Sequence, residues 1–267
     1  MSGIEQSVIL DVCRLKGTFV DDIGNVKQFS GTGFWIKDGE SSVFVTNKHN
    51  VDATISFGST TQLILDELEI ELRGFRGTDP TSATKFFKLA DVTKVVCSQD
   101  ADVAIIRDPE YTDDTGVFSK GNTLDKSDLA DQAFFDQKLK LMDIASFIGF
   151  PGTATSQWWD SVWNFGVARP INIASLPSIP FNHSDLKTSD TTLVSGLSFS
   201  GSSGSVVISH QKSVKPGPGM TNPAYVPAKL IGVMSGHWPE PNTTPSMFSH
   251  SGLSYYTRST SILTLLS

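Results

Sequence analysis

The sequence predicts an all-β protein, built as a barrel or a sandwich, from two observations. Residues 67–72 alternate glutamate with leucine or isoleucine, the period of a strand with one buried face and one solvated glutamate face. Short apolar runs also recur along the chain, separated by clusters of Gly, Pro, Ser, Asn or Asp. Many short strands with few helices are typical of barrels and sandwiches. The clearest runs are residues 8–10, 43–45, 103–106, 148–150, 206–208 and 230–233.

One stretch departs from the strand pattern. Residues 109–142 are polar and acidic, and they include a short predicted helix from Ser127, its expected cap, to Leu139. Residues 259–266 are expected to close the chain with one or two helical turns. The predicted organisation is therefore an N-terminal β unit (1–110), a connection (111–142) and a C-terminal β unit (143–267).

Length and charge exclude several classes of protein. The chain has 267 residues, 21 Lys and Arg, 28 Asp and Glu, and a formal charge of −7. An acidic chain without a basic cluster is poorly suited to bind phosphate backbones, so we expect no nucleic-acid partner. The longest apolar runs fall far short of the roughly 20 residues of a membrane helix, so we expect no membrane partner.

The cysteines and the chain start indicate the compartment. Cys13 and Cys97 are far apart in sequence, and we expect buried free thiols rather than one disulfide bridge. No Cys/His spacing suggests a metal site, so we expect no metal. Residues 1–6 lack the basic and apolar regions of a signal peptide, which predicts a cytoplasmic protein.

Three segments carry residues suited to nucleophilic catalysis. His49 ends an apolar strand where a polar loop begins, which gives an imidazole base rigid support. Asp102 precedes the apolar run 103–106, and Ser203 lies in a Gly/Ser loop before the run 206–208. Each residue alone is more often structural, the serine most of all as part of a turn. Their order along the chain, His then Asp then Ser, is that of one known type of catalytic triad.

The hydrolase elbow is a rival interpretation that the sequence excludes. It needs Gly-x-Ser-x-Gly between a strand and a helix. Here the pattern around Ser203 begins with Gly201 but has Ser205 in the last position, and the β-forming run 206–208 follows.

Five colinear blocks resemble the trypsin-like serine peptidases of the chymotrypsin fold. The nearest resemblance is to the bacterial branch with the Deg/HtrA and glutamyl-endopeptidase types, without their PDZ domain. It covers nearly the whole chain and implies two six-stranded antiparallel β-barrels with a short C-terminal helix, with the site between the barrels. The blocks are Gly31–Phe34 with Val45–His49, Asp102–Ile105, Gly149–Gly152, Gly201–Ser205 and Leu230–Val233.

The resemblance implies a role for each matching residue. Ser203 would be the nucleophile, His49 the general base and then acid, and Asp102 the group that orients His49. The backbone N–H groups of Gly201 and Ser203 would form the oxyanion hole. No cofactor is implied. Ser202 stands where zymogen-type members carry an acid, which argues against activation by N-terminal cleavage.

The same alignment suggests a substrate pocket. Leu197 falls at the pocket floor and Met234 where glutamyl endopeptidases carry a histidine, so an apolar residue is expected before the cleaved bond. The alternative is that both are core residues. Ser235 is expected near Asp102, and Gly236 with His237 would pair with the substrate backbone.

The predicted function is a regulated intracellular serine endopeptidase acting on proteins or peptides. Two alternatives remain open. One is a binding or scaffold module on a protease fold, since fold does not fix function. The other is a protease that stays inactive until a regulatory partner triggers it, such as a stress or defence effector.

Overall fold

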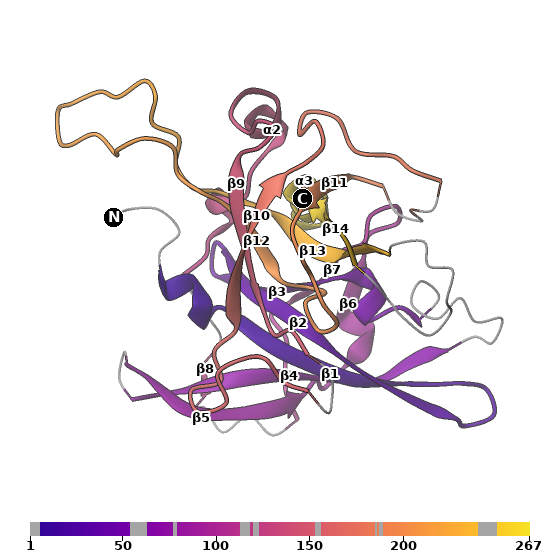
Figure 1. Ribbon diagram of the computed structural model, residues 1–267. Coiled ribbons are helices and arrows are strands. Elements are labelled where there is room, and N and C mark those ends of the chain that lie inside the picture. Colours follow the sequence, from indigo (N-terminus) through magenta and orange to yellow (C-terminus); the bar gives the residue numbers. More distant parts are fainter. Residues whose placement is uncertain are drawn as a thin grey trace.

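The computed structural model describes most of the chain, which forms two β-sheets joined by a short helical connection (Figure 1). In the view of Figure 1, strands β1, β2, β4 and β5 lie below the strands of the C-terminal half. The described residues are 6–53, 63–76, 79–112, 118–119, 123–152, 156–184, 186, 189–239 and 250–267.

The N-terminal sheet has eight strands in the order β5-β4-β1-β2-β3-β7-β6, with β8 paired to β4. It is therefore larger than the six strands expected, because the long β4 pairs with β1, β5 and β8. The strands are β1 (Val12–Val20), β2 (Val26–Asp38), β3 (Ser41–Thr46), β4 (Ile64–Arg76), β5 (Asp79–Lys88), β6 (Val95–Cys97), β7 (Ala104–Arg107) and β8 (Phe118–Ser119).

The C-terminal sheet is a closed six-stranded barrel in the order β10-β11-β14-β13-β12-β9, as expected. All its strand pairs are antiparallel. The all-β prediction is confirmed, as is the C-terminal helix α3 (Ser259–Leu266). The strands are β9 (Ile144–Gly149), β10 (Val167–Ile173), β11 (Thr191–Ser195), β12 (Val206–Ser209), β13 (Leu230–Pro239) and β14 (His250–Arg258).

One hydrophobic cluster spans the two halves, while other clusters lie within each half. The spanning cluster joins Phe34 of β2 and Ile105 of β7 to Ile148 of β9 and Val206 of β12. Ile262 of α3 packs into the same cluster and is fully buried. Burial of apolar surface across this boundary stabilises the halves against each other, so a site between them has rigid walls.

The buried apolar face predicted for residues 67–72 is confirmed, but the prediction that all three glutamates are solvated is wrong for one of them. Leu68, Ile70 and Leu72 are buried in β4. Glu71 is buried as well, because Arg14 of the neighbouring β1 donates two hydrogen bonds to its carboxylate, at 2.8 and 2.6 Å. A paired guanidinium compensates the cost of taking the carboxylate out of water.

Four short 3₁₀ helices and the helix α2 complete the described secondary structure. The helix expected from Ser127 to Leu139 is split, because Asp125 and Asp131 rather than Ser127 cap its two pieces. None of the helices in the described ranges is long and apolar enough to cross a membrane. The elements are η1 (Gln6–Leu10), η2 (Lys48–Asn50), η3 (Val92–Lys94), η4 (Lys126–Asp128) and α2 (Gln132–Gln137).

Both cysteines are free, as expected. Cys13 is buried in β1 and Cys97 is half-buried in β6. Burial raises the pKa of the Cys97 thiol to about 11, and it raises that of Cys13 as well. Within the described ranges, no group of three His, Cys, Asp or Glu side chains could hold a metal ion.

Candidate active site

His49, which is partly exposed, pairs with the buried Asp102 at one end of the N-terminal sheet. The short helix η2 follows β3 directly and carries His49, while Asp102 lies two residues before β7. The distance from His49 Nδ1 to Asp102 Oδ2 is 2.8 Å, and the His49 backbone N–H donates to Asp102 Oδ1 at 2.9 Å. Because Nδ1 faces the carboxylate, Nε2 is the ring nitrogen left to take a proton from a nucleophile.

Asn47 connects this pair to the C-terminal barrel. Its buried Nδ2 donates to the Asp102 carbonyl oxygen at 2.8 Å and to Ser235 Oγ at 3.0 Å. Ser235 Oγ lies 2.9 Å from Thr257 Oγ1, so the hydroxyl is fixed on both sides. Ser235 is thus placed beside the Asp102 segment.

The loop that carries Ser203 is held by the opposite half of the protein. The Ser203 carbonyl oxygen accepts from the Thr32 backbone N–H at 2.9 Å and from Asn50 Nδ2 at 3.2 Å. Asn50 follows His49 directly, so the base and the serine share one support. Gly204 has φ +91°, and a Cβ there would collide with the Thr32 carbonyl oxygen, so only glycine fits.

The Gly201 peptide is anchored on both of its sides. The Ser200 carbonyl accepts from the Gly152 N–H at 2.7 Å, and a trans peptide directs the Gly201 N–H the opposite way. The Gly201 carbonyl accepts from the buried Thr32 Oγ1 at 2.7 Å, and the same Oγ1 accepts from the Phe150 N–H at 3.0 Å. One threonine thus ties β2, the end of β9 and the serine loop together.

A cavity of about 260 Å³ adjoins Ser203, and we call it the β13 pocket. Met234, Gly236 and His237 line it. Leu197, the expected floor, does not. Its side chain is 46 % exposed, and the next residue, the buried Ser198, faces the pocket instead. The other lining residues are Phe199, Ser200, Ser202, Ser203 and Tyr255, so the wall is mixed rather than apolar.

His250 lies beside this pocket, where its ring contacts those of two lining residues, Phe199 and His237. Its ring stacks on that of His237 with the centroids 4.7 Å apart. Its Nδ1 accepts from the Gly252 N–H at 2.9 Å. Burial lowers the pKa of both imidazoles, and the positive potentials of His237 and Arg169 lower that of His250 further. The pairing of β13 with β14 joins the two rings, which no local sequence signal predicts.

No protein-family model and no curated protein matches the chain in sequence. Solved structures match it in fold. The active form of the Rv3671c protease from M. tuberculosis superposes with a TM-score of 0.52 at 14 % identity, covering 98 % of this chain and 82 % of that one. The protease domain of MamO from Magnetospirillum magneticum gives 0.51 at 12 % identity, covering 98 % of both chains.

The HtrA-type protease AlgW with a tripeptide gives a TM-score of 0.50 at 14 % identity. The match covers 96 % of this chain and 58 % of the AlgW chain. The two antiparallel sheets, the shared core between them and these three superpositions agree, and the chain has the chymotrypsin-like fold of the trypsin-like and HtrA-type serine proteases.

Proposed function

We propose that the chain is a serine endopeptidase that cleaves peptide bonds through an acyl-enzyme. The observation that carries this proposal is the pairing of His49 with the buried Asp102, together with Asn50, which directly follows His49 and donates to the Ser203 carbonyl. A base, its orienting acid and a serine on one connected support are the parts that acyl transfer to a hydroxyl needs. A scaffold module has no need of this arrangement.

In the proposed reaction, His49 Nε2 takes the proton of the Ser203 hydroxyl as Oγ attacks the substrate carbonyl. The N–H groups of Gly201 and Ser203 stabilise the resulting oxyanion. His49 then gives the proton to the leaving amine, and the acyl group stays on Ser203. Water activated by His49 hydrolyses the ester, which regenerates the serine. Asp102 stabilises the imidazolium throughout.

Residues 236–239 of β13 suit a peptide substrate. Strand β12 pairs with β13 only as far as Val233, while β14 continues beside β13 as far as Pro239. An extended substrate could therefore add a strand beside Gly236 and His237, with its side chain before the cleaved bond in the β13 pocket. The AlgW structures with a tripeptide and a decapeptide show that a protease of this fold binds peptides.

Labelling with a fluorophosphonate tests the proposal. We expect one adduct on Ser203, and we expect Ser203→Ala to lower kcat by about 10⁶ because the triad acts as a unit. Ser127→Ala, an exposed serine in η4, is the matched control and should keep wild-type labelling. Failure of the wild-type protein to label, alone and in cell lysate, would count against a catalytic role.

One observation favours a second candidate, a protease that rests inactive until a partner triggers it. Ser203 Oγ donates to the Ser235 carbonyl at 3.5 Å, a long and weak bond that points the hydroxyl toward β13. Labelling that appears only after a partner or substrate protein is added would support this candidate.

A further inference from the structure

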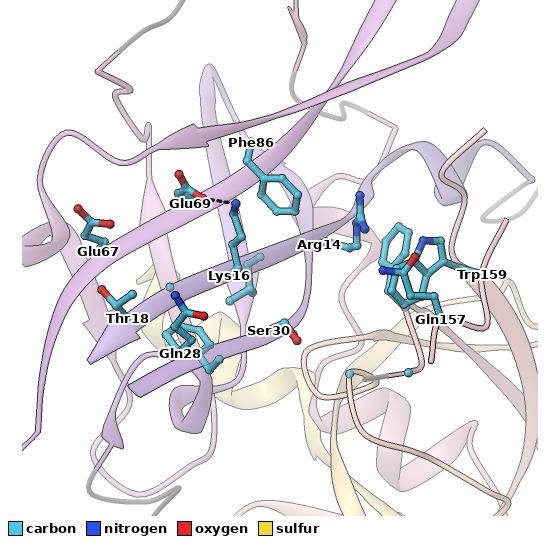
Figure 2. A pocket seen from close by; sticks show the side chains of 17 residues that line it. Arg14, Lys16, Thr18, Gln28, Ser30, Glu67, Glu69, Phe86, Gln157 and Trp159 are labelled. Atoms are coloured by element: carbon cyan, nitrogen blue, oxygen red, sulfur yellow. Dashed lines mark ion pairs between the residues drawn. The ribbon is translucent and has the colours of Figure 1, made fainter. Parts of the chain in front are cut away.

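A second and larger cavity opens on the other side of the serine loop, and we call it the β1 cavity (Figure 2). Its volume is about 520 Å³. Gly201 and Gly152 border it, and it extends over the outer face of β1 and β2 past Lys16 and Gln28. In Figure 2, Trp159 and Arg14 stand on one side and Thr18 and Glu67 on the other.

The two cavities flank the same loop. Ser200, Ser202 and Ser203 border the β13 pocket, whereas Gly201 borders the β1 cavity. A peptide whose scissile carbonyl lies between Ser203 Oγ and the Gly201 N–H therefore has one cavity on each side. Because the β13 pocket takes the segment before the cleaved bond, the segment after it enters the β1 cavity. This assignment rests on the proposed function.

The wall nearest the loop is aromatic and carries no unpaired charge. The Arg14 guanidinium lies 5.2 Å from the ring centroid of Phe86, 5.8 Å from that of Phe150 and 5.1 Å from that of Trp159. Its charge is already matched by the two bonds to Glu71. Such a wall offers ring faces and stacked methylene groups to a ligand rather than a free cation.

Farther along, the charges of the cavity also occur in pairs. Lys16 Nζ lies 2.7 Å from a carboxylate oxygen of Glu69 and 4.4 Å from the centroid of Phe86. Glu67 pairs with Lys88. The lining therefore has no net preference for an acidic or a basic side chain, and apolar contact is the selective interaction that remains.

We infer that this chain selects substrates mainly by the residue that follows the cleaved bond, and that the β1 cavity takes a bulky aromatic or aliphatic side chain there. The cavity has twice the volume of the β13 pocket, 520 against 260 Å³, and the rings of Phe86, Phe150 and Trp159 gather around Arg14 on the side of it that lies nearest the serine loop. A side chain in it would also contact Phe150, Gly152 and Trp159. The Gly152 N–H orients the Ser200 carbonyl and with it the Gly201 N–H.

The test compares peptides with an ester. Two peptide series vary only the residue after the cleaved bond (Gly, Ala, Leu, Phe) or only the residue before it, and a simple alkyl ester lacks any segment after the bond. With the wild-type protein, we expect kcat/KM to rise about tenfold to hundredfold from Gly to Phe in the first series. We expect the second series to change kcat/KM less.

Trp159→Ala should abolish most of the rise in kcat/KM from Gly to Phe. Each peptide kcat/KM is divided by the ester kcat/KM of the same variant, so a partial loss of folded protein does not affect the ratio. Trp163→Ala is the control, because it removes an exposed tryptophan four residues farther along the chain that lines neither cavity. Ester hydrolysis with a flat first series, or a full gain in Trp159→Ala, overturns this inference alone. If the wild-type protein neither hydrolyses the ester nor reacts with the fluorophosphonate, the proposed function is overturned, and this inference falls with it.

Discussion

Loss of the Thr32 hydroxyl should both destabilise the fold and disturb the candidate active site. The hydroxyl is fully buried, donates to the Gly201 carbonyl and accepts from the Phe150 N–H. Thr32→Val keeps the volume and the β-branched shape and removes only the hydroxyl. The packing of β2 is therefore preserved, while two backbone groups lose their partner.

The expected cost follows from the burial of those two groups. The Phe150 N–H is buried, and leaving it without an acceptor costs about 1–3 kcal/mol. The bond to the partly buried Gly201 carbonyl adds a net contribution of about 0.5–1 kcal/mol. We therefore expect Thr32→Val to lower the free energy of unfolding by about 1.5–4 kcal/mol in total.

Urea denaturation measures this difference directly, with Thr32→Ser as the matched control. Serine keeps the hydroxyl and loses one methyl group, so it should lower the free energy of unfolding by only about 1 kcal/mol. We also expect Thr32→Val to slow fluorophosphonate labelling, because the anchored Gly201 peptide is released. A valine variant within about 0.5 kcal/mol of wild type would refute the assignment of Thr32 as the junction of the two halves.

Three further outcomes follow from the described contacts. Asn50→Ala removes a donor to the Ser203 carbonyl, so we expect kcat to fall about tenfold with KM unchanged, a split that general unfolding does not produce. Cys13 and Cys97 should react with a thiol reagent only slowly in the native protein and fully in urea, because burial raises both pKa values; fast native labelling would contradict this. Burial and nearby basic groups lower the pKa of His250 in the folded state, so the unfolded state gains protons first as pH falls. The free energy of unfolding should therefore decrease below about pH 6.5, and less steeply in His250→Gln, as urea titrations at several pH values would show.

Local pattern was sufficient to predict the elements that carry the site. The apolar runs beside His49 and Asp102 predict that both residues lie at strand ends. Strands β3 and β7 form from these runs and pair with each other. Alternation in residues 67–72 likewise predicted a strand with a buried apolar face. These signals depend only on residues within a few positions of one another.

Features set by distant partners were missed. Glu71 is buried because Arg14, 57 residues away, pairs with it, and a pattern of neighbours contains no such information. The alignment predicts Leu197 at the pocket floor, but Ser198 lines the pocket instead, because one step in an extended chain turns the side chain to the other side. His250 meets His237 only through the register of β13 and β14.

The helix in the connection shows the limit of capping rules. Ser127 is a good cap by type, yet Asp125 and Asp131 accept the backbone N–H bonds that begin η4 and α2. Serine and aspartate are nearly equal as caps, so which one begins the helix depends on the path of the chain. That path is fixed by contacts such as the Ala130 N–H bond to the Leu230 carbonyl, which the connection alone does not specify.

The hydrogen bonds from the N-terminal half to the serine loop have a consequence for how the protein folds during synthesis. Thr32 bonds a carbonyl 169 residues later in the chain, and Asn50 bonds one 153 residues later. Synthesis proceeds from the N-terminus, so these donors leave the ribosome long before their acceptors. A nascent chain therefore carries an unfinished site until the C-terminal barrel has emerged and docked. If the proposed function holds, the order of assembly alone keeps the nascent chain from cleaving neighbouring proteins during translation.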